Sequence, residues 1–322
     1  MSLNLERLRV LDAVAATGSV AGAAAALHVT TSAVSQQLAR LERETGQELT
    51  ERHGRVLRLT PAGALLAGHA AELLAHAERV EASLAEHRGA VAGPLRVAAF
   101  ATAARGLLPP VLRELRGRHP ALEPALAEME PHEALPLLRR GELDVAVVQD
   151  WAADPLAVGD GLARRDLLDD RFDVAVPAEH WAAARADIAV AELAGEAWIG
   201  WSRGQICHDW LLGTLRGIGA EPRVAHTASE HSTQLALVAA GLGIAVLPRL
   251  GCDVVPPGVR LVPIAPAAVR RVFAVWRATT SSRPAIRAAL TALEQAAAQL
   301  RAAEGRAEAT RGRATAAGLD AA

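Results

Sequence analysis

The sequence contains no lysine, so all 34 of its basic side chains are arginines. They are balanced by 36 acidic residues, and the net charge of -2 gives the whole chain no general attraction to nucleic acid or to an anionic membrane. Aromatic residues make up only 3%. The two cysteines, Cys207 and Cys252, are too few for a disulfide framework and fit a reducing compartment.

Long hydrophobic runs are missing as well. The longest, from Leu235 to Leu247, is shorter than a membrane span of about 20 residues and ends at Pro248. The first residues, Met1 to Arg7, lack the apolar segment of a secretory signal. With 51% hydrophobic and 22% charged residues, the 322-residue chain is expected to form two or three globular domains in the cytoplasm, without contact to a membrane.

The first sixty residues predict short helices followed by a hairpin. Leucine and valine recur every three residues from Leu5 to Val14, which indicates one face of a helix. Further helices are expected over 20–27 and 31–44, and two short strands over 48–59. This order of elements predicts a winged helix-turn-helix.

The third of these helices is expected to read DNA. Recognition helices contact base edges through residues near their N-terminus, and Gln36 can form a bidentate pair with adenine. The hairpin is locally basic and suits phosphate or minor-groove contact. Charge alone does not favour this function, because residues 1–60 hold seven arginines against six acidic residues. The expected DNA contacts are Thr30, Thr31, Ser32, Ser35, Gln36, Arg40, Arg52, Arg55 and Arg58.

A long helix is predicted over 61–88, because Pro61 suits a first helical position. Its apolar side chains recur at spacings of three and four, as in a coiled-coil seam. Packing against its own domain is the alternative, but the charged flanks favour a partner helix. The seam residues expected to hold two chains together are Leu66, Leu73, Val80 and Leu84.

From Leu95 onward, strands alternate with helices, which predicts a parallel α/β sheet. A final helix is expected over 284–303, and a disordered tail over 305–322, where apolar anchors are absent. The expected strands are 95–99, 125–129, 145–148, 172–176, 198–200, 224–227, 244–247 and 272–276.

Ligands of such sheets bind beyond the carboxyl ends of the strands. Arg203 could bind an anion, whereas Glu130 and Asp150 could select a cation. Thr102 and Ser229 can equally be no more than helix caps. The expected effector-binding residues are Phe100, Ala101, Thr102, Ala103, Glu130, Gln149, Ser202, Arg203, Thr227 and Ser229.

Several stretches share the pattern of one known family. They are Ser19 to Ala24, Leu27, Thr30, Ser35, Leu41-Glu42, Gly46, Leu49, Arg52, Arg55, Leu59 to Gly63, Gly93 to Val97, Leu108-Pro109, Leu138 to Asp144 and Val238 to Pro248. With these residues the chain resembles the LysR-type transcriptional regulators over nearly its whole length. Thr50 departs from the pattern, because phenylalanine is usual there, and looser packing beneath the wing is expected.

The resemblance implies a fold in three parts and a tail. These are a winged helix-turn-helix over 1–60, a dimerising linker helix and hinge over 61–92, a two-lobed, periplasmic-binding-protein-like α/β effector domain over 93–304, and a tail over 305–322. Lobe one would comprise 93–163 and 268–304, and lobe two 164–267. The chain would cross between the lobes near Ala163-Arg164 and Ala265-Pro266.

The resemblance also implies a function. The chain would be a sequence-specific DNA-binding transcriptional regulator whose operator binding is modulated by an unknown small-molecule effector. It would form a homodimer on an imperfect palindrome of double-stranded DNA, and a homotetramer through effector-domain contacts. Thr102, Ser202 and Thr227 occupy positions that often contact the family's effectors.

No enzymatic activity, cofactor or metal is expected. The chain has no GxSxG, HExxH or P-loop motif. Cys207 lies near the region where peroxide-sensing members of the family carry a reactive cysteine, but the second cysteine is far along the chain and a buried, inert thiol is favoured. The alternative function is a cytoplasmic two-lobed small-molecule binding protein or enzyme with a vestigial DNA-binding module.

Overall fold

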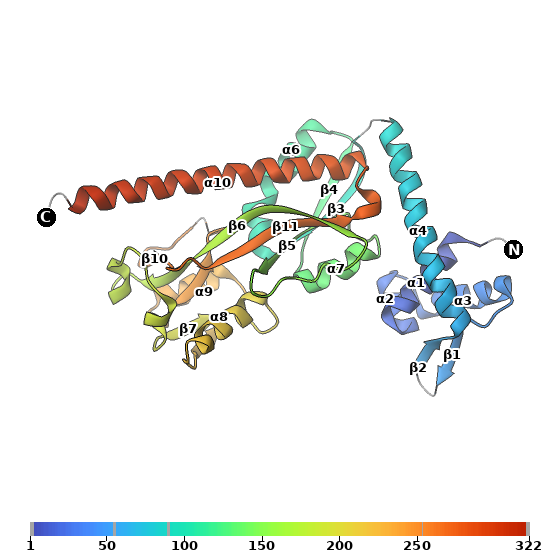
Figure 1. Cartoon of the computed structure of the whole chain (residues 1–322), viewed down its shortest axis with the longest axis horizontal. Helices are drawn as coiled ribbons and strands as arrows, with labels where there is room; N and C mark the ends of the chain where they lie inside the picture. Colours follow the sequence, from blue (N-terminus) through green and yellow to red (C-terminus); the bar gives the residue numbers. More distant parts are fainter. Residues whose placement is uncertain (1–2, 54–55, 89–90, 253, 320–322) are drawn as a thin grey trace.

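The computed structural model describes residues 3–53, 56–88, 91–252 and 254–319. A small helical domain and a larger α/β domain are joined by the long helix α4 (Figure 1). The small domain consists of α1 (Leu5–Thr17), α2 (Val20–Ala26), α3 (Thr31–Thr45), β1 (Thr50–His53) and β2 (Val56–Leu59).

The small domain folds around one apolar core with capped helices. Val34 and Leu38 of α3 are buried against α1, where Leu8 and Leu11 face them. Gly18 and Gly46 end α1 and α3 with φ angles of 66° and 67°, a left-handed conformation that favours glycine.

Helix α4 (Pro61–Arg88) begins within this core and then leaves it. Gly63 is required at its first turn, because a Cβ there would lie 2.0 Å from the carbonyl oxygen of Leu49. Leu66 packs against the core of the small domain, whereas Leu73 is 42% and Val80 47% exposed. The outer half of α4 therefore presents apolar side chains that its own chain leaves exposed.

The α/β domain contains one strongly curled sheet with the strand order β10-β6-β11-β5-β3-β4, and β9 also pairs with β6. β3 is parallel to β4 and β5, while β11 is antiparallel to β5 and β6. A separate parallel pair consists of β7 and β8. The strands are β3 (Gly93–Ala99), β4 (Leu122–Glu128), β5 (Val145–Trp151), β6 (Leu162–Pro177), β7 (Ala197–Gly200), β8 (Arg223–Thr227), β9 (Ala245–Pro248), β10 (Val259–Pro263) and β11 (Val269–Arg277).

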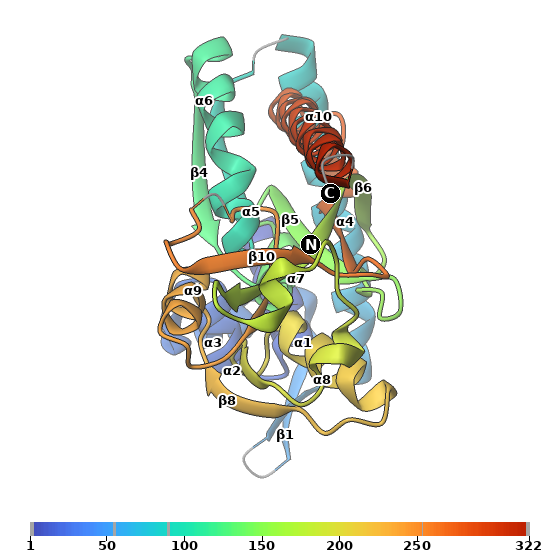
Figure 2. The ribbon, with the colours of Figure 1, turned by 90° about the vertical axis from the view of Figure 1, so that its left-hand side faces the viewer.

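Helices pack against the sheet (Figure 2), and short 3-10 turns follow β6 and β11 along the chain. They are α5 (Ala101–Gly106), α6 (Leu108–Arg118), α7 (Pro131–Arg139), η1 (Trp181–Ala184), η2 (Val190–Leu193), α8 (Ile206–Gly217), α9 (His231–Ala239), η3 (Ala278–Thr280) and α10 (Pro284–Leu319). The turn η3, which follows β11 directly, packs beside α4.

Two main cores divide this domain into lobes, and β6 and β11 pass between them. Leu167 and Leu168 of β6 still pack in the first core, while Phe172 packs in the second. The crossing expected at Ala163-Arg164 therefore lies several residues further along. The expected position was wrong because alternating charged residues in this stretch hide the continuous 16-residue strand β6.

The expected disordered tail from Gly305 is also wrong as far as Leu319, because α10 continues to that residue. Alanine and arginine, which have high helix propensity, make up eight of the fifteen residues from Gly305 to Leu319, and they extend the helix without apolar anchors. In the described ranges no single helix is long and apolar enough to cross a membrane; only α1 and α2 taken together, bent by 117°, meet that test.

Candidate DNA-binding and effector sites

Helix α3 presents a polar face at the edge of the small domain. Its apolar stripe is buried, and the side chains of Thr31, Ser35 and Gln36 point away from the core and are exposed. Thr30 has a capping role, because its Oγ1 accepts a hydrogen bond from the backbone N–H of Ala33 at 3.1 Å. The remaining predicted residues of α3, Ser32 and Arg40, are also exposed.

The wing is attached to α3 through a carboxylate. Oε1 of Glu42 accepts hydrogen bonds from the backbone N–H groups of Leu49 and Thr50, at 3.0 and 3.1 Å, and from the Thr50 hydroxyl at 3.2 Å. The threonine that replaces the family's phenylalanine thus takes part in a polar contact. On β2, Arg58 is exposed and pairs across the hairpin with Glu51.

Two predicted wing contacts lie beyond this description. Arg52 belongs to β1, but its side chain is outside the described part of the structure, and Arg55 lies outside the described residues altogether.

A small cavity of about 30 Å³ lies where the two lobes meet. Residues from the starts of α5, α7, α8, α9 and β11 converge there, together with the end of β5 and the loop before α8. The lining residues are Phe100, Ala101, Thr102, Glu130, Gln149, Trp201, Gln205, Cys207, Ser229, His231 and Arg270.

Arg270 of β11 lines this cavity and is only 2% exposed. Its Nε donates to Oδ2 of Asp170 at 2.9 Å, and its Nη2 lies 2.7 Å from the same oxygen. Nη2 also donates to the Thr102 hydroxyl at 2.6 Å, while Nη1 donates to the Gln149 side chain and lies 4.0 Å from Sγ of Cys207. A guanidinium has five N–H groups, and these contacts use all of them.

His231 of α9 is a neutral donor. Nη2 of Arg105 lies 2.7 Å from its Nδ1, and because a guanidinium only donates, Nδ1 is the acceptor and Nε2 carries the proton. Burial, together with the charges of Arg270 and Arg105, lowers the pKa of His231 to about 3. Among the described residues, Nε2 of His231 and Oε1 of Gln205 are buried without a hydrogen-bond partner.

The structure brings together some of the predicted effector residues and separates others. Thr102 lies inside α5, where Phe100 is the N-cap residue, so the expectation that it is only a cap is wrong. Ser229 donates to Ser202 at 2.8 Å and directly precedes Glu230, the N-cap residue of α9. The predicted residues absent from the cavity lining are Ala103, Ser202, Arg203 and Thr227.

Asp150 is unavailable to a cationic ligand. Both of its oxygens accept hydrogen bonds from Arg271, at 2.7 and 2.9 Å, and Arg164 donates to it at 3.3 Å.

Sequence reasoning missed Arg270, His231 and Gln205. Arg270 and Arg271 lie directly before the apolar run of the strand expected over 272–276. A charged pair that extends such a run is the signal that could have placed them between the lobes.

Two family descriptions match the chain in its order of domains. Residues 5–64 match the bacterial regulatory helix-turn-helix protein of the lysR family, and residues 88–298 match the LysR substrate binding domain. The chain belongs to the LysR family. It is a DNA-binding transcriptional regulator whose operator binding is modulated by a small-molecule effector.

Relatives of this LysR-type regulator are similar over nearly their full lengths. The probable HTH-type transcriptional regulator LrrA of Synechococcus elongatus is 29% identical, over 93% of this chain and 99% of LrrA. The structure of a full-length OxyR cysteine variant from Pseudomonas aeruginosa is 26% identical with a TM-score of 0.63, covering 91% of this chain and 95% of that one. An H2O2-bound OxyR mutant of Corynebacterium glutamicum is 29% identical with a TM-score of 0.58, covering 95% and 97%.

The environment of Cys207 in this LysR-type regulator does not favour peroxide chemistry. The residue is buried, and desolvation raises the pKa of its thiol to about 11, with the charge of Arg270 opposing this rise. The thiolate is the reactive form of cysteine, so a thiol with this pKa is a poor nucleophile near neutral pH.

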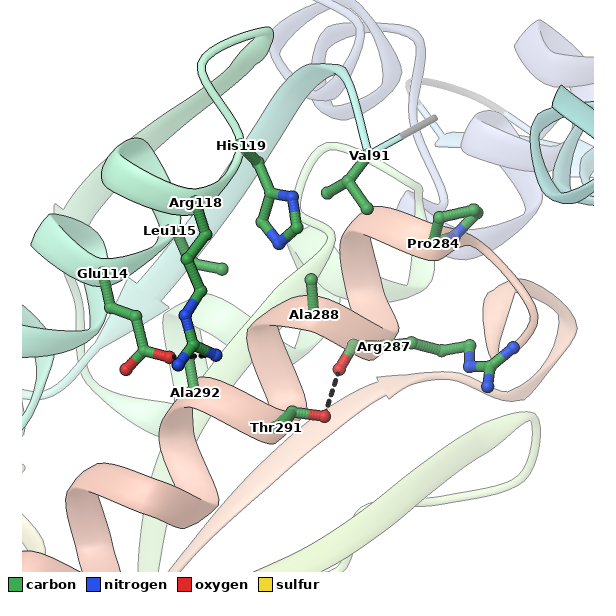
Figure 3. A pocket seen from close by; sticks show the side chains of 10 residues that line it. All are labelled: Val91, Glu114, Leu115, Arg118, His119, Pro284, Arg287, Ala288, Thr291 and Ala292. Carbon is green, nitrogen blue, oxygen red and sulfur yellow. Dashed lines mark hydrogen bonds and ion pairs between the residues drawn. The ribbon is translucent and has the colours of Figure 1, made fainter. Parts of the chain in front are cut away.

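A larger groove of about 400 Å³ lies between α6 and the start of α10 (Figure 3). Arg118 is paired with Glu114 at 2.9 Å along one side, and the Thr291 hydroxyl donates to the carbonyl oxygen of Arg287 on the other. Val91 at its rim precedes β3, so the groove lies toward the beginning of that strand. Effectors of parallel sheets bind at the opposite, carboxyl ends, which favours the interlobe cavity.

Proposed function

We propose that this LysR-type regulator reads its operator with the N-terminal half of α3 and holds the DNA backbone with its wing. The observation that supports this most directly is the exposed polar face of α3 opposite a fully buried apolar stripe. Base contacts are assigned to Thr31, Ser32, Ser35 and Gln36, and backbone contacts to Thr30, Arg40, Arg52, Arg55 and Arg58.

Two chains associate through α4 in this proposal. Leu73, Val80 and the 56%-exposed Leu84 are spaced as a coiled-coil seam, and burying them against a second copy removes apolar surface from water. Leu66 contributes less, because it already packs in the small domain. A two-fold dimer places two α3 helices on half-sites of an imperfect palindrome, and effector-domain contacts extend it to a tetramer.

The effector acts in the interlobe cavity, between a lobe one formed by the strands around β3 and a lobe two formed by those around β7. Phe100, Ala101, Thr102, Glu130, Gln149 and Ser229 line this site, whereas Ala103, Ser202, Arg203 and Thr227 do not belong to its lining. A ligand that touches both lobes changes their relative orientation only by its differential affinity for the two arrangements. The protein acts in the cytoplasm and is not an enzyme.

The test of this function is a gel shift with the intergenic DNA beside the protein's own gene. Specific binding that weakens steeply with salt is expected, since several arginines would release counterions from phosphates. Equal affinity for this DNA and for random DNA at low salt would refute the proposal and favour a two-lobed binding protein. Thr102→Val is expected to weaken the effector response and to leave operator binding without effector unchanged.

A further inference from the structure

The charges around the interlobe cavity do not cancel. Arg270 and Asp170 form a buried pair whose charges offset each other. His231 is neutral because its pKa is about 3, and Cys207 is neutral because its pKa is about 11. Among the described residues that line the cavity, Glu130 has the one half-buried carboxylate that forms no ion pair, although the charge of Arg270 acts on it through space.

An anionic effector is disfavoured by the same contacts. Arg270 is the obvious partner for a carboxylate or phosphate, but all of its N–H groups are engaged by side chains of the chain itself. An anion would have to break one of these buried contacts. Arg105 lies behind the imidazole ring of His231, donates to the carbonyl oxygen of Gly251 and does not line the cavity.

The polar groups that remain are two acceptors and one donor. Glu130 forms no ion pair within the described ranges. The side-chain oxygen of Gln205 is buried without a partner in the described part of the chain, as is the N–H of His231. Leaving such groups unsatisfied costs free energy, so a ligand that pairs with them gains affinity.

We propose that the effector is a small cation that donates N–H hydrogen bonds, namely a protonated primary amine held by Glu130 and Gln205. A hydroxyl oxygen next to the amine would accept the hydrogen bond of His231. Burial raises the pKa of Glu130, and a bound cation would replace the solvation that the carboxylate has lost. The inference rests on the proposed role of this cavity as the effector site.

Size sets a further condition. A volume of about 30 Å³ accommodates about two water-sized groups, which fits methylammonium without movement of the lobes. Ethanolamine is longer and would require the lobes to separate, so ligand length becomes a measure of how far they open.

The experiment measures thermal unfolding of the full chain with methylammonium or ethanolamine, against acetate and ethylene glycol at matched ionic strength. Ethylene glycol is the neutral counterpart of ethanolamine, so this pair isolates the ammonium group. We expect both amines to raise the unfolding midpoint with concentration, and acetate and ethylene glycol to leave it unchanged.

Three variants assign the effect to the cavity. Glu130→Gln should weaken amine binding about tenfold or more and Gln205→Leu by a smaller factor, whereas Glu123→Gln, an exposed carboxylate at the other end of β4, should bind as the unmodified protein does. Stabilisation by acetate equal to that by the amines, or an unaltered amine response in Glu130→Gln, would overturn the proposal.

A gel shift separates this inference from the proposed function. Specific operator binding together with no amine effect overturns the ligand class alone. Amine binding that depends on Glu130 but is accompanied by no specific DNA binding supports the ligand class and overturns the proposed operator function.

Discussion

The polar face of α3 and the polar lining of the interlobe cavity use similar side chains in opposite ways. On α3, hydroxyl and amide groups point to water and make few contacts with one another; the hydrogen bond between Gln36 and Ser32 is long, at 3.5 Å. In the cavity, Thr102, Gln149 and Arg270 are buried and bonded together. A partner of the α3 face replaces only water and breaks few hydrogen bonds within the protein. A ligand of the interlobe cavity must instead fit among side chains that already bond to one another.

The variant Arg270→Met tests this contrast with the largest expected effect, a loss in the free energy of unfolding. It leaves Asp170 buried and unpaired, and removing one partner of a buried ion pair costs about 3–5 kcal/mol. We expect urea unfolding of the α/β domain to show a loss of this size. The double variant Arg270→Met with Asp170→Leu should lose much less, and a single-variant loss below about 1 kcal/mol would show that the cavity depends on its internal bonds no more than α3 does.

The variant Leu73→Arg tests the exposed apolar surface of α4, for comparison with the polar α3 face and the polar cavity lining. A charge in the proposed α4 seam should convert the proposed dimer to monomers at micromolar concentration, because two arginines would face each other in an apolar contact. Light scattering measures the mass. Glu72→Arg on the same helix should remain a dimer, and a monodisperse monomer of the unmodified protein would contradict the assembly.

Gln36→Ala and Arg58→Ala sharpen the description of the DNA-binding surface. Loss of a good base contact at Gln36 should reduce the preference for the operator by about 1–3 kcal/mol. Arg58→Ala should instead weaken binding to all DNA alike and flatten the salt dependence. Gel-shift titrations on operator and random DNA compare the two, and identical behaviour of both variants would contradict the division of roles.

The last expected effect, which is negligible near neutral pH, is a pH dependence from His231. Its pKa of about 3 in the folded chain lies below the unperturbed value of 6.5, so the unfolded chain binds more protons between these pH values. Stability should therefore fall as the pH falls through this window, with a contribution of at most about 1.4 kcal/mol per pH unit. His231→Gln should flatten the slope measured by urea unfolding, whereas His226→Gln, an exposed residue of β8, should not.

The two surfaces also differ in how well the sequence predicted them. The α3 face depends on a cap and on a periodicity within one helix, so the helix expected over 31–44 is confirmed as α3, with Thr30 as its N-cap and with Val34 and Leu38 buried. In contrast, Arg270 meets Thr102 across 168 positions of sequence. No local pattern records such a contact, because it depends on how β11 and α5 are brought together by the sheet.

The same limit explains the errors along the chain. The strand expected over 172–176 is much shorter than β6, because only the buried half of β6, around Val174, has an apolar sequence. The other half pairs through its backbone and carries charged side chains. The extension of α10 has a different cause: the absence of apolar anchors predicts disorder, whereas the alanines and arginines of this stretch continue the helix.

Strand β11 continues directly into η3, which packs beside α4, and this connects the interlobe cavity to the linker helix. Arg270 sits on β11, and the chain runs from it through a hydrogen-bonded strand to the turn that touches the linker helix. A shift of the strand along its own axis would therefore reach α4 through covalent bonds, without a relay of side chains across the core of lobe one. The angle between two α4 helices, and with it the distance between two α3 helices on DNA, would then follow the position of a single strand.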